Sequence, residues 1–187
     1  MDNTHAQTTI LVTGPARSGK SEWAERLAHE SGRPVLYIAT AREDPDDADW
    51  TARIAAHRQR RPAHWLTLCS PTELELALLT VGTGECCLLV DSLGTWVANL
   101  LELDDAAWST HCAQVLDALV QRPAALVILV AEETGWGVIP AYPQGRVFRD
   151  RLGALVRRLG PRADATYLVT GGYALDLRRL GVPIDRA

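Results

Sequence analysis

Apolar residues along this chain gather in five short runs, and in most of these runs they follow one another directly instead of alternating with polar residues. The runs are TTILVTG (8–14), PVLYIAT (34–40), CCLLVDS (86–92), ALVILVAEE (125–133) and ATYLVTGG (165–172). Apolar runs without alternation are typical of strands that are buried on both faces, as in a parallel sheet. The pattern therefore predicts five strands of a mostly parallel sheet.

Segments with helical character lie between these runs. We predict helices over residues 18–30, 49–60, 104–121 and 144–159. The second is expected to end before Pro62, because the residue that precedes a proline avoids the helical region. Strands that alternate with helices indicate βαβ units, so the predicted fold is α/β, a mostly parallel sheet flanked by helices.

Length and composition favour one domain. The chain has 187 residues, of which 47% are hydrophobic and 22% charged, and it has no linker rich in Pro, Gly or Ser. We therefore predict a single nucleotide-binding domain over residues 1–187, with residues 1–8 as a flexible leader. The four cysteines form no C-x-x-C pair, and we expect them to be buried instead of serving a metal or redox role.

Charge and hydropathy exclude some classes of partner. The net charge of −4 gives no general attraction to polyanions, so nucleic acid is not expected. No apolar run reaches the roughly 18 residues that a transmembrane helix needs. The first residues lack the features of a signal peptide, and we expect a cytoplasmic protein.

The segment ILVTGPARSGKS (10–21) carries the strongest chemical signal. It matches G-x-x-x-x-G-K-[ST] between a predicted strand and a predicted helix. Such glycines let backbone N–H groups converge on phosphate oxygens at a helix N-terminus, Lys20 would reach the β- and γ-phosphates, and the Ser21 hydroxyl would bind Mg²⁺. The alternative is a chance glycine-rich turn. The predicted phosphate-binding residues are Gly14, Pro15, Ala16, Arg17, Ser18, Gly19, Lys20 and Ser21.

Carboxylates end two of the predicted strands. Asp91 follows CCLLV, where it would lie beside the metal and the nucleotide, although a helix cap or turn would use the same residue. Glu132 and Glu133 end the next strand, and one of them is a candidate for metal or hydroxyl contact, the alternative being a solvated acidic strand end. The loop ETGWGVIP (133–140) after that strand is either a lid over a substrate or only a connection.

A basic stripe surrounds one histidine. Arg53, His57 and Arg61 are spaced four residues apart, so they are expected to share one face of a helix. The arginines would grip phosphate oxygens, and their charge would keep the imidazole neutral and able to attack phosphorus with formation of a phosphoramidate. A solvated basic helix with an idle histidine is the alternative from spacing alone.

These segments recur in the same order and spacing in one enzyme family. The phosphate-binding motif, or P-loop, reads G-x-x-R-S-G-K-S here, and it is followed by R-I-x-x-H-x-x-x-R-P. This combination is far more specific than the P-loop alone. Four further segments accompany it, namely VLYIATA, LLVDSLGTWVANLL, EETGWGVIP and GRVFRDRLG. From about Ile10 to Gly172, the chain resembles the bifunctional adenosylcobinamide kinase/adenosylcobinamide-phosphate guanylyltransferases of cobalamin biosynthesis.

The resemblance implies a RecA-like P-loop NTPase fold, a homotrimer, and two reactions that use Mg²⁺. ATP or GTP phosphorylates adenosylcobinamide, and GTP then guanylylates the cobinamide phosphate through a GMP-histidine intermediate at the position of His57. It also implies functional roles for residues that recur at these positions in the family, namely Arg53, Arg61, Asp91, Arg146, Arg149 and Asp150.

The chain departs from the family pattern at four positions. Glu132 replaces a common Asn, so only Glu133 corresponds; Cys69 replaces a common Glu, and Val156-Arg157 replaces a common Asn-Gln pair. Three alternatives therefore stay open: a P-loop kinase of another small alcohol, a guanylyltransferase without kinase activity, and a non-catalytic nucleotide-binding switch.

Overall fold

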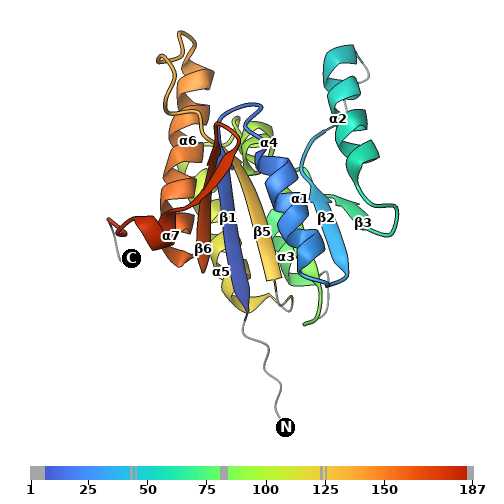
Figure 1. Ribbon diagram of the computed structural model, residues 1–187. Helices are drawn as coiled ribbons and strands as arrows, with labels where there is room; N and C mark the ends of the chain where they lie inside the picture. Colours follow the sequence, from blue (N-terminus) through green and yellow to red (C-terminus); the bar gives the residue numbers. More distant parts are fainter. Residues whose placement is uncertain are drawn as a thin grey trace.

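The computed structural model describes residues 7–42, 44, 46–80, 84–122, 124 and 126–184, without the side chains of Arg53 and Thr80. Within these residues the strands form one seven-stranded sheet of order β3-β2-β4-β5-β1-β6-β7 (Figure 1). All pairs are parallel except β6 with β7. The strands are β1 (Thr8–Gly14), β2 (Val35–Ala39), β3 (Leu66–Cys69), β4 (Cys87–Asp91), β5 (Leu126–Glu132), β6 (Ala165–Thr170) and β7 (Tyr173–Asp176).

The predicted α/β fold with a mostly parallel sheet is confirmed, and the strands include all five predicted runs. β1 begins at Thr8, inside the range predicted as a leader, because this residue already pairs with Leu126 of β5. Residues 1–6 of that range lie outside the described residues.

The four predicted helices are present, with others between them. The helices are α1 (Lys20–Glu30), α2 (Ala48–Arg60), α3 (Leu74–Thr80), α4 (Leu93–Asn99), α5 (Asp105–Gln121), α6 (Pro143–Leu159) and α7 (Leu177–Leu180). α1 begins at Lys20 because Gly19 has a positive φ of 89°. α2 ends at Arg60, and Arg61 before Pro62 is extended, as predicted.

The core has two halves because successive residues of each buried strand face opposite sides of the sheet. Leu11 and Leu88 pack into one half with α3, α4, α5 and α6, whereas Val12 and Leu89 pack into the other with α1. Burial on both faces explains why these runs show no polar alternation. Packing on both faces of the sheet holds the neighbouring strands β4, β5 and β1 in place. The residues at their carboxyl ends are thereby positioned next to one another.

Two segments project beyond the carboxyl end of the sheet. In Figure 1, α2 rises at the right of this end, and the segment between β5 and α6 rises at the left, with the turn between β1 and α1 between them.

Within the described residues, no helix has both the length and the apolar character that crossing a bilayer requires.

The cysteines agree with the prediction in three of four cases. Cys86, Cys87 and Cys112 are buried and free, but Cys69 at the end of β3 is exposed. The prediction of burial is wrong for Cys69 because β3, which pairs with β2 alone within the described ranges, forms the edge of the sheet.

Candidate active site around the P-loop

The predicted phosphate-binding residues form the turn from β1 into α1. A Cβ at Gly14 would overlap the carbonyl oxygen of Val169 and lie 2.7 Å from Ser18 Oγ, so no larger residue fits without displacement of the turn. Arg17 and Gly19 adopt positive φ angles of 58° and 89°. Lys20 is buried, with its Nζ 3.5 Å from the carbonyl oxygen of Pro15. This compact turn at a helix N-terminus is suited to hold phosphate groups.

The turn between β1 and α1 and the helix α2, which carries His57, line the same cavity. A cavity of about 450 Å³ is lined by Lys20 and Ser21 from α1, by Asp91 at the end of β4, and by His57 of α2. Its other walls are contributed by several elements and include Tyr37, Trp50, Ile54, Arg61, Cys69, Ser92 and Glu132. The structure therefore brings together six predicted site residues from four separate parts of the sequence, namely Lys20, Ser21, His57, Arg61, Asp91 and Glu132.

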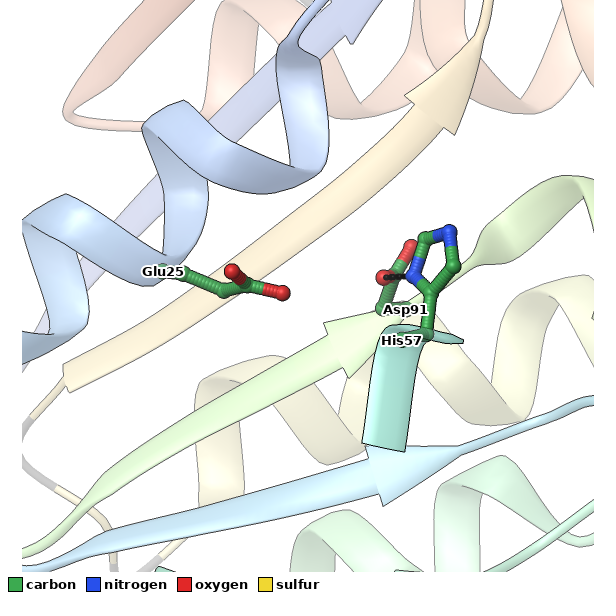
Figure 2. A group of neighbouring side chains, drawn as sticks. All are labelled: Glu25, His57 and Asp91. Atoms are coloured by element: carbon green, nitrogen blue, oxygen red, sulfur yellow. Dashed lines mark ion pairs between the residues drawn. The ribbon is translucent and has the colours of Figure 1, made fainter. Parts of the chain in front are cut away.

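Asp91 lies at the centre of this group. Its Oδ1 accepts a hydrogen bond from Ser21 Oγ at 3.4 Å, and its Oδ2 accepts one from the Tyr37 hydroxyl at 2.5 Å. The same Oδ2 lies 3.6 Å from His57 Nδ1, while the other ring nitrogen points away from the carboxylate (Figure 2). Asp91 thus connects α1, α2 and β2.

Opposing effects act on the ionisation of Asp91. Burial raises its pKa, but the hydrogen bonds from His57 and Tyr37, the charge of His57 and the hydrogen bond from Ser21 together lower it by more, so the pKa lies below its usual value. Burial and the neighbouring carboxylate raise the pKa of Tyr37, so its hydroxyl stays protonated and donates. The site therefore contains a buried, ionised carboxylate.

The guanidinium of Arg60 lies between the imidazole and two carboxylates of α1. Its Nη2 lies 3.4 Å from His57 Nδ1 and 3.3 Å from Glu25 Oε1, and its Nη1 donates to Glu22 Oε1 at 2.7 Å. Burial raises the pKa of Glu25, and the charge of Arg60 offsets part of this rise. These ion pairs attach α2 to α1.

Glu25, His57 and Asp91 offer ligand atoms that all lie within 4.8 Å of one another, and Figure 2 shows Glu25 pointing from α1 toward the other two. A His with two carboxylates is a donor set that divalent metals accept. However, the guanidinium of Arg60 already contacts Glu25 and His57 and compensates the charge of the carboxylate. The cluster is therefore explained as an ion-pair network.

The predicted stripe of Arg53, His57 and Arg61 is wrong for Arg61. Pro62 forces Arg61 out of the helix, and its guanidinium lies 3.4 Å from the ring centroid of Tyr37, although it still lines the cavity. Arg53 belongs to α2, but its side chain lies outside the described part of the structure.

The two glutamates at the end of β5, Glu132 inside the strand and Glu133 just after it, point to different places. Glu132 lines the cavity, and its Oε1 accepts a hydrogen bond from Ser92 Oγ at 2.7 Å. The Oε1 of Glu133 instead accepts from the backbone N–H of Gly135 at 2.5 Å, within the loop that follows. Of the two, Glu132 is therefore better placed to contact a ligand in this cavity.

Arg146 and Arg149 hold the same loop instead of lining the P-loop cavity. Arg146 donates to the carbonyl oxygens of Pro140 and Ala141, and Arg149 donates to that of Gly135. Asp150 lies with Glu132, Glu133 and Arg149 around a smaller pocket of about 260 Å³. The two arginines therefore determine the shape of the loop, and the structure brings neither to the histidine.

Sequence reasoning missed Tyr37, Glu25 and Arg60. Tyr37 lies within an apolar run that predicted only a strand, and nothing in the sequence distinguishes its hydroxyl. Arg60 could have been found from the expected helix end. It lies three residues after His57, and residues three apart on a helix are neighbours, whereas Arg61 has to leave the helix before Pro62.

A buried lysine and serine on a glycine-containing turn between a strand and a helix, beside an acidic strand end of a parallel sheet, define the P-loop NTPase fold. Two solved structures share this fold. The ATPase of a bacterial type III secretion system aligns with a TM-score of 0.58 and 11% identity, over 94% of this chain and 58% of that one. The ATP synthase subunit NeqB of Nanoarcheaum equitans aligns with a TM-score of 0.52 and 11% identity, over 95% of this chain and 52% of that one. This chain thus spans little more than half of either protein, and at such identity the likeness shows the fold alone.

Sequence comparison assigns the family. The profile of the cobinamide kinase / cobinamide phosphate guanyltransferase family (CobU) matches residues 10–177, and the chain belongs to this family. The bifunctional adenosylcobalamin biosynthesis protein CobP of Pseudomonas aeruginosa is 41% identical over 169 residues, which are 90% of this chain and 96% of that protein. The corresponding CobU of Salmonella typhimurium is 36% identical over 182 residues, 90% of this chain and 99% of that protein. The predictions of family, fold and enzyme class are confirmed.

Proposed function

We propose that this protein catalyses two successive reactions of cobalamin biosynthesis in the cavity between the P-loop and α2. ATP or GTP phosphorylates adenosylcobinamide, and GTP then converts the adenosylcobinamide phosphate to adenosyl-GDP-cobinamide. Membership of the family supports both reactions. The observation that carries the proposal is that His57 lines the same cavity as Lys20, Ser21 and Asp91.

The P-loop would hold the triphosphate in both reactions. Backbone N–H groups of residues 14–21 and the ammonium of Lys20 would bind its oxygens. The fold and the family imply a divalent metal, and Ser21 Oγ and the ionised Asp91 Oδ1, 3.4 Å apart, are oxygen donors of the kind that Mg²⁺ prefers. When bound, Mg²⁺ would neutralise charge on the phosphates; Ser21 and Asp91 would be its protein ligands.

His57 would act as the nucleophile through Nε2. Its Nδ1 faces Asp91, which would hold the proton on Nδ1 and leave a lone pair on Nε2. The Nε2–P bond would form at the α-phosphorus as the bond to pyrophosphate breaks, and Asp91 would stabilise the positive charge left on the ring. A phosphate oxygen of the cobinamide phosphate would then displace the imidazole and take the GMP.

Retention of label from α-labelled GTP tests this step. We expect acid-labile label on the protein, which peptide mass should map to His57 and ³¹P NMR to its Nε2. The label should be lost in His57→Ala. It should be kept in the control His64→Ala, which changes an exposed histidine. A kinase of another alcohol would retain no label, and a nucleotide-binding switch would release no pyrophosphate.

Separate assays distinguish the two half-reactions. His57→Ala should still phosphorylate cobinamide with ATP, whereas Lys20→Ala should lose both activities, because both need the triphosphate held at the P-loop. If the unaltered protein fails to phosphorylate cobinamide but still forms guanylylated His57, it is a guanylyltransferase only.

The family resemblance also leads us to propose a homotrimer. Large apolar side chains are exposed on β7 and the segment that follows it, which supports self-association through this edge. They are Tyr173, Leu175, Leu177, Leu180, Val182 and Ile184. Sedimentation equilibrium would measure the assembly, and a monomer at micromolar concentration would contradict the proposal.

A further inference from the structure

The segment between β5 and α6 starts beside the P-loop. Glu132, the last residue of β5, pairs in register with Gly14, and the backbone N–H of Glu133 donates to the carbonyl oxygen of Gly14 at 2.8 Å. The segment then rises from the carboxyl end of the sheet to the start of α6 (Figure 1). Its base is therefore held next to the residues that would bind the triphosphate.

This segment exposes four large apolar side chains within seven residues, which we call the apolar loop surface. The exposed fractions are 63% for Trp136, 95% for Val138, 75% for Ile139 and 78% for Tyr142. Large apolar side chains that are exposed on one short segment mark a candidate binding surface, because their burial by a ligand is favourable.

Hydrogen bonds fix the backbone that carries these side chains. Arg149 donates to the carbonyl oxygen of Gly135 at 2.6 Å, and Arg146 donates to those of Pro140 at 3.0 Å and Ala141 at 2.7 Å. Gly145 of α6 packs closely on Pro140, since a Cβ there would lie 2.8 Å from Pro140 Cβ. A surface with its shape fixed in advance loses little conformational entropy when a ligand binds.

The acceptor substrate of the family has the chemistry to cover this surface. Cobinamide is a broad corrin ring that carries amide side chains, and its methyl groups and conjugated ring system can contact apolar side chains. The hydroxyl that accepts the phosphoryl group lies at the end of a short aminopropanol arm. Lys20, Ser21 and His57 line two pockets, one of about 450 Å³ and one of about 1040 Å³. The larger is lined mostly by polar and charged residues of the P-loop and α2, which suits a triphosphate, and the smaller has room for one small ligand. We therefore expect the corrin ring to rest on apolar surface outside both pockets.

We propose that the apolar loop surface binds the corrin ring of cobinamide and of cobinamide phosphate, with the arm directed past Glu132 into the P-loop cavity. This inference rests on the proposed function. It assigns Arg146 and Arg149 the task of shaping the corrinoid site, in place of direct contact with the nucleotide.

A double variant and a matched control test the inference. In Val138→Ser/Ile139→Ser, we expect the Kd for cobinamide, measured by equilibrium dialysis through the visible absorbance of the ring, to rise at least about ten-fold. The Kd for Mg-GTP and the labelling of His57 should stay within about two-fold, since neither residue lines the P-loop cavity. The control Leu66→Ser/Val120→Ser removes apolar side chains at 71% and 74% exposure on β3 and α5, away from the loop and from β7, and should leave cobinamide binding unchanged.

Fluorescence provides a second measurement. The corrin ring absorbs where tryptophan emits, so cobinamide should quench the part of the emission that is lost in Trp136→Phe. If this emission is not quenched and the double variant binds cobinamide like the unaltered protein, the inference is overturned.

Two further outcomes are decisive. If the double variant changes the sedimentation of the free protein, the surface is a contact between copies of the chain, and the inference is wrong. If the unaltered protein neither binds cobinamide nor phosphorylates it, the proposed function fails; if it does both and the double variant does so equally well, only this inference fails.

Discussion

Asp91 shows how a single buried carboxylate organises the site. Burial of a charged group costs free energy unless hydrogen bonds and opposite charges compensate it. Loss of one partner leaves the buried charge partly uncompensated, which destabilises the folded protein. Here a hydroxyl from β2, a hydroxyl from α1 and an imidazole from α2 all approach the two oxygens. The stability of the site and the orientation of the nucleophile therefore depend on the same contacts.

The Tyr37 hydroxyl tests this dependence. Tyr37→Phe removes a hydrogen bond to an ionised group, and we expect the free energy of unfolding in urea to fall by about 1.5–3 kcal/mol. Tyr173→Phe, at a tyrosine that is 74% exposed, should change it by less than about 0.5 kcal/mol. Equal effects of the two changes would contradict the role of the hydroxyl.

The effect of Tyr37→Phe should also depend on pH. The folded pKa of Asp91 lies below its unfolded value of 3.8, so the carboxylate contributes stability above pH 3.8 that is lost as pH falls through the lowered pKa. The difference between the two proteins should therefore be full at neutral pH and should shrink below pH 3.8. Urea unfolding at several pH values measures it, and a difference that grows on acidification would contradict the assigned ionisation.

At this scale the sequence predicts residues whose chemistry comes with a motif. Lys20 and Ser21 were predicted from the P-loop motif, Asp91 from its place at a strand end, and His57 from the resemblance to the family. The structure brings these four residues to one cavity. The Tyr37 hydroxyl was not predicted, because its partner Asp91 lies 54 residues away and the contact exists only after β2 and β4 pair.

Among the elements, α2 is attached through its polar side chains. It carries the histidine, yet it projects beyond the carboxyl end of the sheet (Figure 1). Ion pairs of Arg60 with Glu22 and Glu25 join it to α1. Ion pairs near the surface contribute little to global stability. They can nevertheless decide how often a marginally attached helix opens.

Arg60→Gln separates local from global effects. We expect the free energy of unfolding to change by less than about 1 kcal/mol, while amide hydrogen exchange in α2 accelerates by up to about five-fold. Exchange in β1 and β5 should not change. Arg26→Gln, which removes an exposed pair with Glu30 inside α1, is the matched control and should leave exchange in α2 unaltered. Acceleration throughout the sheet would show that Arg60 supports the whole fold.

The turn before α1 gives a second prediction for an element. Gly14→Ala places a methyl group against the Val169 carbonyl and Ser18 Oγ, so we expect a loss of about 1–3 kcal/mol in urea unfolding and weaker binding of Mg-GTP. Gly153 lies inside α6, where an added Cβ would meet nothing within 4 Å, and Gly153→Ala should stabilise the protein by about 0.5–1 kcal/mol. Destabilisation by both changes would show that the close contact is not the cause.

Sequence patterns predicted the elements that are long or fully buried and missed the others. β3 (LTLC) and β7 (YALD) have four residues each, and each includes a polar residue, so neither forms an apolar run as long as those of the buried strands. α3 and α4 have seven residues and α7 has four, too few to establish a helical period. These elements depend on their neighbours in the fold for their stability.

Across the whole molecule, the parallel sheet accounts for the assembly of the site. Because β1, β4 and β5 run in the same direction, their carboxyl ends bring Gly14, Asp91 and Glu132 to one edge, and this edge was predictable from the order of strands and helices. The placement of α2 over that edge was not, because it depends on side-chain pairs between elements that no local pattern records.

Nucleotide binding at this end of the sheet should stabilise the whole fold, since the P-loop joins α1 to β1, an inner strand that pairs with β5 and β6. At a concentration one hundred times Kd, a ligand that binds only the folded state adds about 2.7 kcal/mol. For a chain of 187 residues, this corresponds to a rise in Tm of about 5–11 °C. We expect this rise with Mg²⁺ and a hydrolysis-resistant GTP analogue in calorimetry, and we expect the same rise in His57→Ala. Lys20→Ala should show a much smaller rise at the same concentration, because it lacks the ammonium that would hold the phosphates. An equal rise in Lys20→Ala would mean that the nucleotide is held elsewhere, and the shared cavity could then not serve both reactions.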